Sequence, residues 1–216
     1  MQTFDFNSIK DFDKHISLSI PNYEFLFTQV KMLVEVFAER NTSVVDVGCS
    51  TGRLIDSLEV DPTTSCLGID SSNLINKALK KNLQPNKRYV KKDFNTCAFP
   101  ERCSVVSAVF FLQFLGSMER QQALRKMSHC LNNSGVMIVC EKTYYKDSRL
   151  EHIFNSHYLE AKRKDFADKA ILDKNIKLAA SMNLVTDHQL IGELSEFGDV
   201  SVFFKSMGFI GCVVRT

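Results

Sequence analysis

Short apolar runs rich in β-branched residues alternate with amphipathic segments through residues 43–142, and no other feature limits the possible folds as much. Ser117 can cap the amphipathic segment at 117–131. Residues 132–135 are predicted to form a turn. Strands that alternate with helices form a parallel sheet with helices on both faces. The predicted strands are 43–47, 65–70, 88–91, a run that begins at 104, and 136–142; the predicted helices are about 22–39, 53–59, 74–83 and 117–131.

The last part of the chain has a different pattern. Residues 146–197 are mostly helical, polar and rich in charge, and two short strands, 200–205 and 208–214, follow them around a tight turn. Helices placed before a terminal hairpin form a lid over the carboxyl edge of the sheet, where open α/β sheets bind their ligands. We therefore predict one α/β domain over residues 1–216, with a helical cap at 1–40 and this insert as its lid.

Composition narrows the class of protein. The 216 residues, 44% of them hydrophobic, are sufficient for one sizeable core. The net charge of +2 does not require nucleic acid as a partner, and we interpret the basic stretch at 80–92 as a solvated face. No apolar run approaches the roughly 20 residues that span a bilayer. The seven cysteines include no Cys-x-x-Cys pair, which indicates reduced, buried thiols in a cytoplasmic protein, and no metal site is predicted.

The segment "VVDVGCSTG", Val44 to Gly52, joins the first predicted strand to the helix that follows it. Gly48 and Gly52 let the turn pass close to a ligand without a Cβ in the way. A dinucleotide-binding turn has a further glycine between them, where this chain has Ser50, so a pyrophosphate fits poorly. The turn therefore favours a ligand without phosphate.

Acidic residues stand in or directly after three successive strands. Asp46 lies inside the first strand, Asp70 ends the second, and Asp93 follows the third. A carboxylate at the end of the second strand accepts hydrogen bonds from the two hydroxyls of a ribose, and Asp93 is in place to meet an adenine amino group. Each acid alone has a structural interpretation, as a cap or a loop residue. Together they predict a site for adenosine with a cationic tail.

The motifs "VVDVGCSTG", "GID" and "KKDF" resemble the cofactor motifs of the class I S-adenosylmethionine (SAM)-dependent methyltransferases. Within that superfamily the chain is most similar to the carboxy-S-adenosylmethionine (carboxy-SAM) synthase family, through "SIPNY", "DVGCSTG", "LQFL" and "CEK". The resemblance implies a Rossmann-like class I methyltransferase fold, with three αβα layers and a mostly parallel seven-stranded sheet. It also implies a reaction in which SAM and prephenate give carboxy-SAM, which serves wobble-uridine modification of tRNA. The enzyme would be a cytoplasmic homodimer, and a separate enzyme would act on the tRNA.

The resemblance also assigns the site. It places the cofactor against Gly48, Cys49 and Ser50 on the methionine side, Asp70 and Ser71 on the ribose, Asp93 and Phe94 on the adenine, and Tyr23, Asp46, Gly52 and Val109 around them. Two positions depart from the family. Val109 stands where the family has an asparagine, and Lys177, counted back from "LVTD" without gaps, stands where an arginine holds the transferred carboxylate. Lys177 is the predicted catalytic cation, with Lys174 as the alternative; a lysine keeps the charge but lacks the bidentate fork of arginine.

Three functions share this predicted site. In methyl transfer the sulfonium is already a strong electrophile, so the protein needs only to orient a small-molecule nucleophile and exclude water. In carboxyl transfer a proton leaves the methyl group, carbon dioxide from prephenate is captured, and a cation stabilises the developing charge. A protein that binds SAM without turnover is the non-enzymatic interpretation. Glu141 and Lys142, after the fifth strand, are predicted either to reach the substrate or to form a structural pair.

Overall fold

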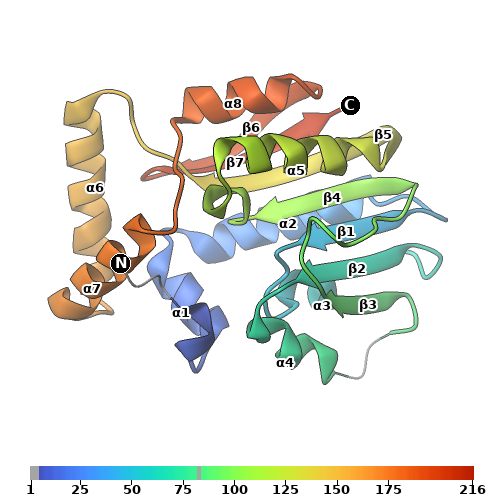
Figure 1. The fold of residues 1–216 in the computed structure, drawn as a ribbon, viewed down its shortest axis with the longest axis horizontal. Helices are drawn as coiled ribbons and strands as arrows, with labels where there is room; N and C mark the ends of the chain where they lie inside the picture. The colour runs from blue at the N-terminus through green and yellow to red at the C-terminus, as the bar shows by residue number, and fades with distance from the viewer. Residues whose placement is uncertain (1–4, 82–83) are drawn as a thin grey trace.

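Seven strands form one sheet in the order β3-β2-β1-β4-β5-β7-β6 in a computed structural model of the chain, which describes residues 5–81 and 84–216 (Figure 1). β7 is antiparallel to both neighbours, and all other neighbouring pairs are parallel. The predicted mostly parallel sheet with a terminal hairpin is thus confirmed. The strands are β1 (Ser43–Val47), β2 (Ser65–Asp70), β3 (Lys87–Lys91), β4 (Cys103–Val109), β5 (Leu131–Lys142), β6 (Asp199–Ser206) and β7 (Phe209–Arg215).

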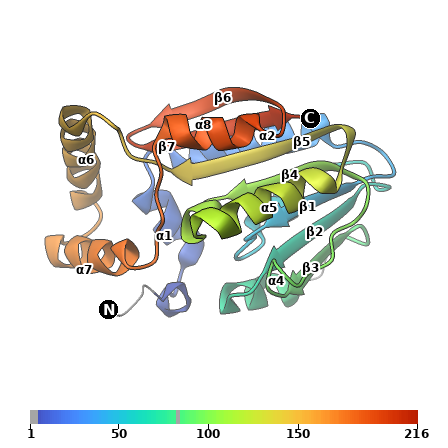
Figure 2. The same ribbon diagram turned by 45° about the horizontal axis from the view of Figure 1, so that its top comes forward.

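Helices cover both faces of the sheet, as predicted for three αβα layers. α2, α3 and α4 lie on one face, and α5 and α8 lie on the other (Figures 1 and 2). The helices are α1 (Phe12–Ser19), α2 (Tyr23–Phe37), α3 (Arg53–Ser57), α4 (Asn76–Leu79), α5 (Ser117–His129), α6 (Ser148–Arg163), α7 (Asp168–Ala179) and α8 (Asp187–Ser195), with short 3-10 helices η1 (Phe6–Ser8), η2 (Asn73–Ile75) and η3 (Leu112–Phe114).

The central strands contribute apolar side chains to two cores, one on each face. In β1, Val44 packs toward α2 and contacts the core that contains Leu26, whereas Val45 and Val47 pack toward α5. These side chains are at most 1% exposed, and each buried valine or leucine contributes about 1.5–3 kcal/mol. Burial on both faces explains why these strands lack a polar alternation. Asp46 is the exception among these apolar side chains, because it is an acid that points to the same face of the sheet as Val44.

The predicted lid separates into two parts. α6 and α7 stand beyond the carboxyl edge of the sheet, near α1 (Figures 1 and 2). α8 instead packs on the sheet through Leu190 and Leu194, which are 1% and 0% exposed. Thr186 begins this helix, because its hydroxyl oxygen accepts the N–H of Gln189 at 3.1 Å. Of the segment predicted to be a lid, α6 and α7 stand at the edge of the sheet, whereas α8 belongs to a helical layer.

Three local predictions were wrong. β5 begins at Leu131, so residues 132–135 continue the strand instead of forming a turn, and Gly135 bonds through its carbonyl to the Thr216 hydroxyl at 3.1 Å. The N-cap of α5 is Gly116 and not Ser117, because the Glu119 carboxylate accepts the Gly116 N–H at 3.0 Å. The helix predicted at 74–83 is divided between η2 and α4 and ends at Leu79. Residues 82–83, and residues 1–4 of the predicted cap, lie outside the described residues.

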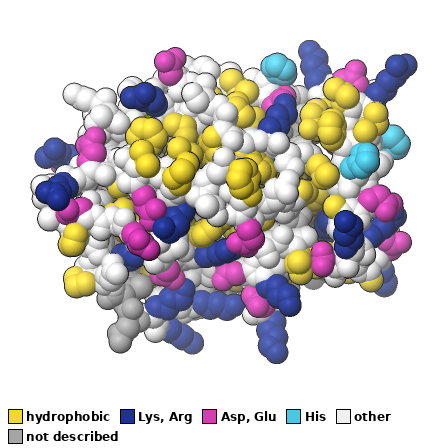
Figure 3. Space-filling model, turned by 180° about the vertical axis from the view of Figure 1, so that it is seen from behind, with side chains coloured by type: hydrophobic (Ala, Val, Ile, Leu, Met, Phe, Trp, Pro, Cys, Tyr) yellow, Lys and Arg dark blue, Asp and Glu magenta, His cyan; other side chains and the backbone are white. Residues whose placement is uncertain are grey.

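All seven cysteines are free and buried, which confirms the prediction that these side chains are buried. Among the described residues, no helix combines the length and the apolar character that a membrane crossing requires. The face seen from behind carries hydrophobic side chains scattered among charged ones (Figure 3). Those of α2 that are more than half exposed are Phe25, Met32 and Val36.

Candidate functional site

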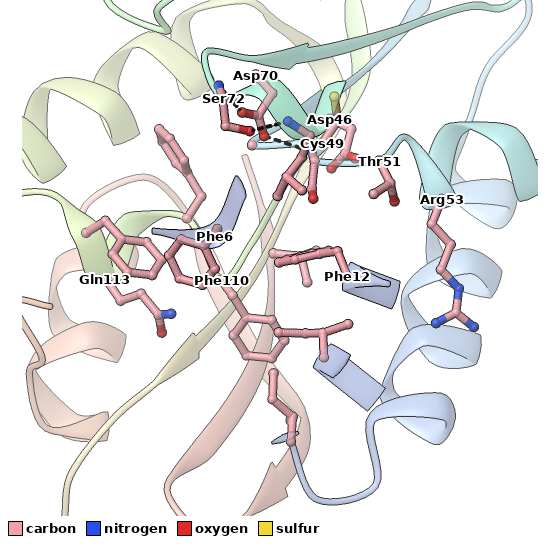
Figure 4. Close-up of a pocket in the computed structure, with 18 of the residues that line it drawn as sticks. Phe6, Phe12, Asp46, Cys49, Thr51, Arg53, Asp70, Ser72, Phe110 and Gln113 are labelled. Carbon is pink, nitrogen blue, oxygen red and sulfur yellow. Dashed lines mark hydrogen bonds between the residues drawn. The ribbon is translucent and has the colours of Figure 1, made fainter. Parts of the chain in front are cut away.

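A cavity of about 460 Å³ lies at the carboxyl edge of the sheet, between the ends of β1, β2 and β4 and the helices α1, α2 and α7 (Figure 4). A volume of this size suits a small organic ligand. The three acids predicted to share a site all line it. The predicted cofactor-binding residues in its wall are Tyr23, Asp46, Gly48, Cys49, Ser50, Asp70, Ser71, Asp93, Phe94 and Val109; Gly52 is not among the lining residues.

The β1–α3 turn forms one wall of the cavity. Both of its glycines, Gly48 and Gly52, are required by their backbone conformation and by the space around them. Gly48 has φ +71°, and a Cβ there would lie 2.9 Å from the Phe111 ring. Gly52 has φ +81° and begins α3, and a Cβ there would lie 2.5 Å from the Tyr89 side chain. The Tyr89 hydroxyl donates to the Gly52 carbonyl at 2.7 Å. Gly52 therefore shapes the turn from behind, whereas Gly48 faces the cavity.

Asp70 is held at the cavity wall by two backbone N–H groups. Its carboxylate accepts from the N–H of Ser50 at 2.8 Å and from the N–H of Ser72 at 2.7 Å (Figure 4). These bonds connect the turn after β1 to the turn after β2. A carboxylate oriented in this way still has lone pairs for two vicinal hydroxyl groups, since each carboxylate oxygen accepts more than one bond.

Asp46 is a buried acid at the floor of the cavity. It is 4% exposed, and its carboxylate accepts the Ser107 hydroxyl at 2.7 Å. Burial, together with the negative charge of Asp70, raises the pKa of Asp46 to about 7 against the opposing effect of the Ser107 hydrogen bond. A cationic ligand beside this group would compensate the buried charge, because an opposite charge nearby favours the ionised form.

The end of β3 provides an acid and an aromatic platform. Asp93 is exposed and accepts the N–H of Asn95 at 2.8 Å. Phe94 is 7% exposed and lies 5.3 Å from the Phe99 ring and 5.5 Å from the Phe111 ring, centroid to centroid. A flat ring with an amino group fits beside these two residues, since aromatic faces attract other rings and a carboxylate accepts from an amino group.

Two side chains of the β1–α3 turn, Ser50 and Cys49, indicate ligand binding rather than nucleophilic chemistry. The Ser50 hydroxyl oxygen is buried and has no hydrogen-bond partner among the described residues. A buried polar atom without a partner is costly, and a ligand in the cavity would supply one. Burial raises the pKa of the Cys49 thiol well above its usual range, so the thiolate does not form. Within residues 5–81 and 84–216, no cluster of His, Cys, Asp or Glu is suited to a metal ion.

Tyr23 begins α2 and lines the cavity with its ring between two aromatic neighbours. The ring centroid lies 6.3 Å from that of Phe27 and 6.4 Å from that of Phe110. Burial raises the pKa of the Tyr23 hydroxyl, which therefore remains protonated. The guanidinium of Arg53 lies 4.1 Å from the Phe27 ring centroid and pairs with Glu24. Arg53 thus holds the start of α2 against α3.

The "LQFL" and "CEK" motifs support each other at the ends of β4 and β5. The Glu141 carboxylate accepts the N–H groups of Phe111, Leu112 and Gln113 at 3.2, 2.7 and 2.9 Å. The Gln113 side-chain oxygen accepts the N–H of Lys142 at 2.8 Å. Burial raises the pKa of Glu141 to about 8, and these donors oppose the rise. Glu141 is therefore structural, whereas Gln113 and Lys142 line the cavity.

Lysines occupy the lid end of the cavity. Lys142 and Lys174 line it, whereas Lys177 is not among the lining residues. The Lys174 ammonium donates to the Ser19 hydroxyl at 3.0 Å and lies 2.7 Å from the Nε2 atom of His15. Of the two lysines considered from the sequence, Lys174 lines the cavity and Lys177 does not. Sequence reasoning did not single out Phe110 or Gln113 as site residues, although "LQFL" drew attention to their neighbourhood.

Comparison with known proteins finds one family profile that matches part of the chain, and similar proteins that share one name. The family profile described as "Methyltransferase domain" matches residues 44–135. Proteins named carboxy-S-adenosyl-L-methionine synthase from Staphylococcus epidermidis and Citrobacter koseri are similar to this chain, with 24% and 27% identity. The alignments cover 94% and 96% of this chain and 91% and 88% of those proteins.

Solved structures with the same fold include two methyltransferases. A SAM-dependent methyltransferase from Aquifex aeolicus has a TM-score of 0.61 and 16% identity, over 96% of this chain and 99% of that chain. Human N-acetylserotonin methyltransferase in complex with SAM has a TM-score of 0.62 and 15% identity, over 91% of this chain and 52% of that chain. These likenesses confirm the predicted fold.

Proposed function

We propose that this chain, a SAM-dependent transferase with a class I methyltransferase-like fold, adds a carboxyl group from prephenate to the methyl carbon of SAM. One observation carries the proposal: a single cavity joins the acid-lined end formed by Asp46, Asp70 and Asp93 to an end lined by Lys142 and Lys174. Carboxylation creates a new negative charge, which a cation stabilises, whereas methyl transfer needs no cation there. The similarity to proteins named carboxy-SAM synthase over more than nine tenths of the chain supports it.

The acid-lined end fits SAM by the chemistry of its groups. Asp70 would accept from the ribose hydroxyls, and Asp93 with Phe94 would hold the adenine. Asp46 would face the cationic methionine part, and the unpartnered Ser50 hydroxyl would bond to it. This arrangement fixes the methyl carbon near the centre of the cavity by binding the rest of the molecule, so that orientation contributes to the rate.

The lysine-lined end would receive the carboxyl group. Lys174 is held by the Ser19 hydroxyl, which orients its ammonium. Prephenate loses a carboxyl group and its ring hydroxyl and leaves as phenylpyruvate and water, while the methyl carbon of SAM loses a proton and gains the carboxyl group. A fixed cation lowers the energy of the developing carboxylate more in a water-excluding cavity than in water. We assign this role to Lys174 in place of Lys177 because Lys174 lines the cavity.

The same proposal includes the biological setting that the resemblance implies. Carboxy-SAM would serve wobble-uridine modification of tRNA through a separate enzyme, and the chain would act as a cytoplasmic homodimer. Light scattering of the purified protein tests the dimer, with a mass of one chain as the contradicting result. Loss of the modified wobble uridine in a deletion strain, restored by this chain, tests the role in tRNA.

The proposed reaction is tested by mass spectrometry of the small molecules. The purified protein is incubated with SAM and with prephenate whose carboxyl carbons are labelled with carbon-13. The expected product is a SAM derivative that is heavier by one labelled carboxyl group, accompanied by phenylpyruvate. An incubation without prephenate is the control. Unchanged SAM in the complete mixture, with the protein folded and SAM bound, would contradict the proposal.

A small-molecule methyltransferase is the second candidate, and the apolar part of the cavity favours it. The phenylalanine side chains in the wall can enclose an aromatic methyl acceptor. They are Phe6, Phe12, Phe27, Phe94, Phe110, Phe111, Phe114 and Phe209. Formation of S-adenosylhomocysteine from SAM with a small-molecule extract, without any carboxylated product, would identify this activity. Retention of SAM with neither product would identify a binding protein.

A further inference from the structure

Lys126 of α5 reaches the loop after β3, which carries Asp93 and Phe94 of the cavity wall. Its ammonium donates to the Phe94 carbonyl and, at 3.2 Å, to the Asn95 carbonyl. A lysine near the C-terminus of a helix commonly bonds to carbonyls of its own helix, whereas this lysine bonds to carbonyls of another segment. It therefore ties α5 to residues 93–95, which we call the base loop.

The same ammonium contacts two aromatic rings. It lies 4.7 Å from the centroid of the Phe94 ring and 5.0 Å from the centroid of the Phe99 ring. Phe94 lines the cavity and Lys126 does not, so the cation lies over one face of the Phe94 ring and leaves the other face to a ligand. The Phe99 ring meets the Phe94 ring at an interplanar angle of 82°. A cation and a second ring thus hold Phe94 in place.

The base loop also orients its own carboxylate. The Asp93 carboxylate accepts the N–H of Asn95 at 2.8 Å. The Asp93 carbonyl accepts the N–H groups of Thr96 and Cys97 at 3.2 and 3.0 Å. These bonds use the polar groups of the loop itself, whereas the next two carbonyls bond to α5. Since Asp93 is exposed, its position depends on how firmly the loop is held, because an unrestrained loop samples many conformations.

The partial burial of Lys126 strengthens its contacts with the base loop. Burial lowers the pKa of the ammonium, and nearby negative groups, among them the Asp93 carboxylate, oppose the shift. Hydrogen bonds from a charged donor are stronger than those between neutral groups, and a desolvated cation interacts more strongly with a ring face. The cation also polarises the π-electrons of Phe94 toward itself, so the free face of the ring is less repulsive to the nitrogen lone pairs of a purine.

We propose that Lys126 is a positioning residue that gives this enzyme its selectivity for adenine over other purine bases. Lys126 holds the base loop so that the Asp93 carboxylate accepts from the 6-amino group while the Phe94 ring contacts the plane of the base. A purine with a carbonyl at position 6 brings an acceptor against the carboxylate, and the two repel each other. The inference rests on the proposed function for the placement of adenine beside Asp93 and Phe94, and it adds a residue outside the cavity that enforces the choice of base.

Calorimetric titration with two ligands that differ only in the purine base tests the proposal. The ligands are S-adenosylhomocysteine and S-inosylhomocysteine, which carries a carbonyl at position 6. We expect the wild type to bind the adenine ligand about tenfold or more tightly. Lys126→Met should weaken binding of the adenine ligand about tenfold and reduce the preference between the bases to within about threefold. Equal affinity of the wild type for the two ligands would overturn the proposal.

Further variants separate positioning from a general effect on the fold. Lys126→Arg keeps a cation that can donate to both carbonyls, so it should retain a preference of at least about fivefold for the adenine ligand. Arg125→Met removes an exposed cation from the adjacent position of α5 and should leave both affinities within about twofold of the wild type. A folded Lys126→Met protein with the full preference, its two affinities unchanged or lowered alike, would refute the role of Lys126. Lys126→Gln, which removes the charge but keeps a polar tip, carries the same test if the methionine variant does not fold.

The titrations contain no prephenate, so their outcome is independent of the proposed reaction. A base preference that is lost in Lys126→Met, in a protein that does not carboxylate SAM, supports the positioning role and contradicts the reaction. Carboxylation of SAM by a wild-type protein that binds both ligands equally supports the reaction and contradicts the positioning role. A wild-type protein that does not bind S-adenosylhomocysteine at all would contradict both.

Discussion

Replacing Lys162 with methionine is expected to stabilise the protein in the absence of ligand. The residue is 3% exposed and its ammonium lacks a hydrogen-bond partner among the described residues. An unsatisfied buried donor costs about 1–3 kcal/mol, and more when it is charged. Its contact with the Tyr158 ring offsets about 0.5–2 kcal/mol of that cost. Methionine keeps an unbranched apolar stem, so we expect a net gain of about 1–2 kcal/mol in the free energy of unfolding.

Urea unfolding at pH 7, followed by circular dichroism, measures this gain. The midpoint should rise without a change in the slope m, and the thermal midpoint should rise by about 2–8 °C. Lys169→Met is the control, because it removes an ammonium that is 85% exposed, and its effect should stay within about 0.5 kcal/mol. If Lys162→Met unfolds at lower urea concentration than the control, the buried ammonium contributes to stability and the reasoning fails.

The pH dependence gives the same prediction a second test. The pKa of Lys162 is about 8 in the folded protein and 10.5 in its ordinary environment. Between these values the unfolded chain binds more protons than the folded one, so stability rises with pH across this interval. The advantage of Lys162→Met should therefore shrink as the pH increases from about 8 to about 10.5. An advantage that grows over this range would contradict the assignment of a buried, destabilised cation.

Further predictions concern the cavity. Asp70→Ala should weaken binding of S-adenosylhomocysteine at least about 100-fold in calorimetry, because two hydrogen bonds to a carboxylate are lost; unchanged affinity in a folded variant would exclude the ribose assignment. Because the pKa of Asp46 is raised to about 7, affinity for SAM should increase from pH 6 to pH 8 as the carboxylate ionises, and Asp46→Asn should flatten this profile in the same titration. Lys174→Met should lower the rate of carboxy-SAM formation far more than Lys177→Met does, because of these two lysines only Lys174 lines the cavity. Mass spectrometry of the product measures both rates. A larger loss in Lys177→Met would instead assign the cation to Lys177.

The fold could be predicted from the sequence because its signals are local. Strands such as β1 are apolar on both faces, and a glycine-bounded turn follows directly, so the periodicity alone indicates a covered parallel sheet. That the acids at the strand ends lie near one another could also be predicted, because the ends of parallel strands meet at one edge of the sheet. α8 was misplaced because its polar composition hides the buried pair Leu190 and Leu194, whose partners lie on distant strands.

The lysine end of the site depends on packing that no local pattern records. Lys174 and Lys177 are one turn apart on α7, and counting back from a downstream motif cannot decide which of them faces the cavity. Lys162 resembles any other lysine of a charged helix until α6, which also carries Tyr158, is packed beside Lys142 of β5. Gln113 was quoted within a motif, but its bond to the Lys142 N–H forms only when β4 and β5 are paired.

The cover of the cavity is assembled from two distant parts of the polypeptide. Ser19 of α1 bonds to Lys174 of α7, which follows it by 155 residues, and to Tyr158 of α6, which follows it by 139. The strands that carry the acids are synthesised between these parts. The ribosome therefore completes the acid-bearing strands before it makes α6 and α7. The cavity gains its cover only after most of its floor has been synthesised, because the residues that join α1 to α6 and α7 are so far apart in the chain.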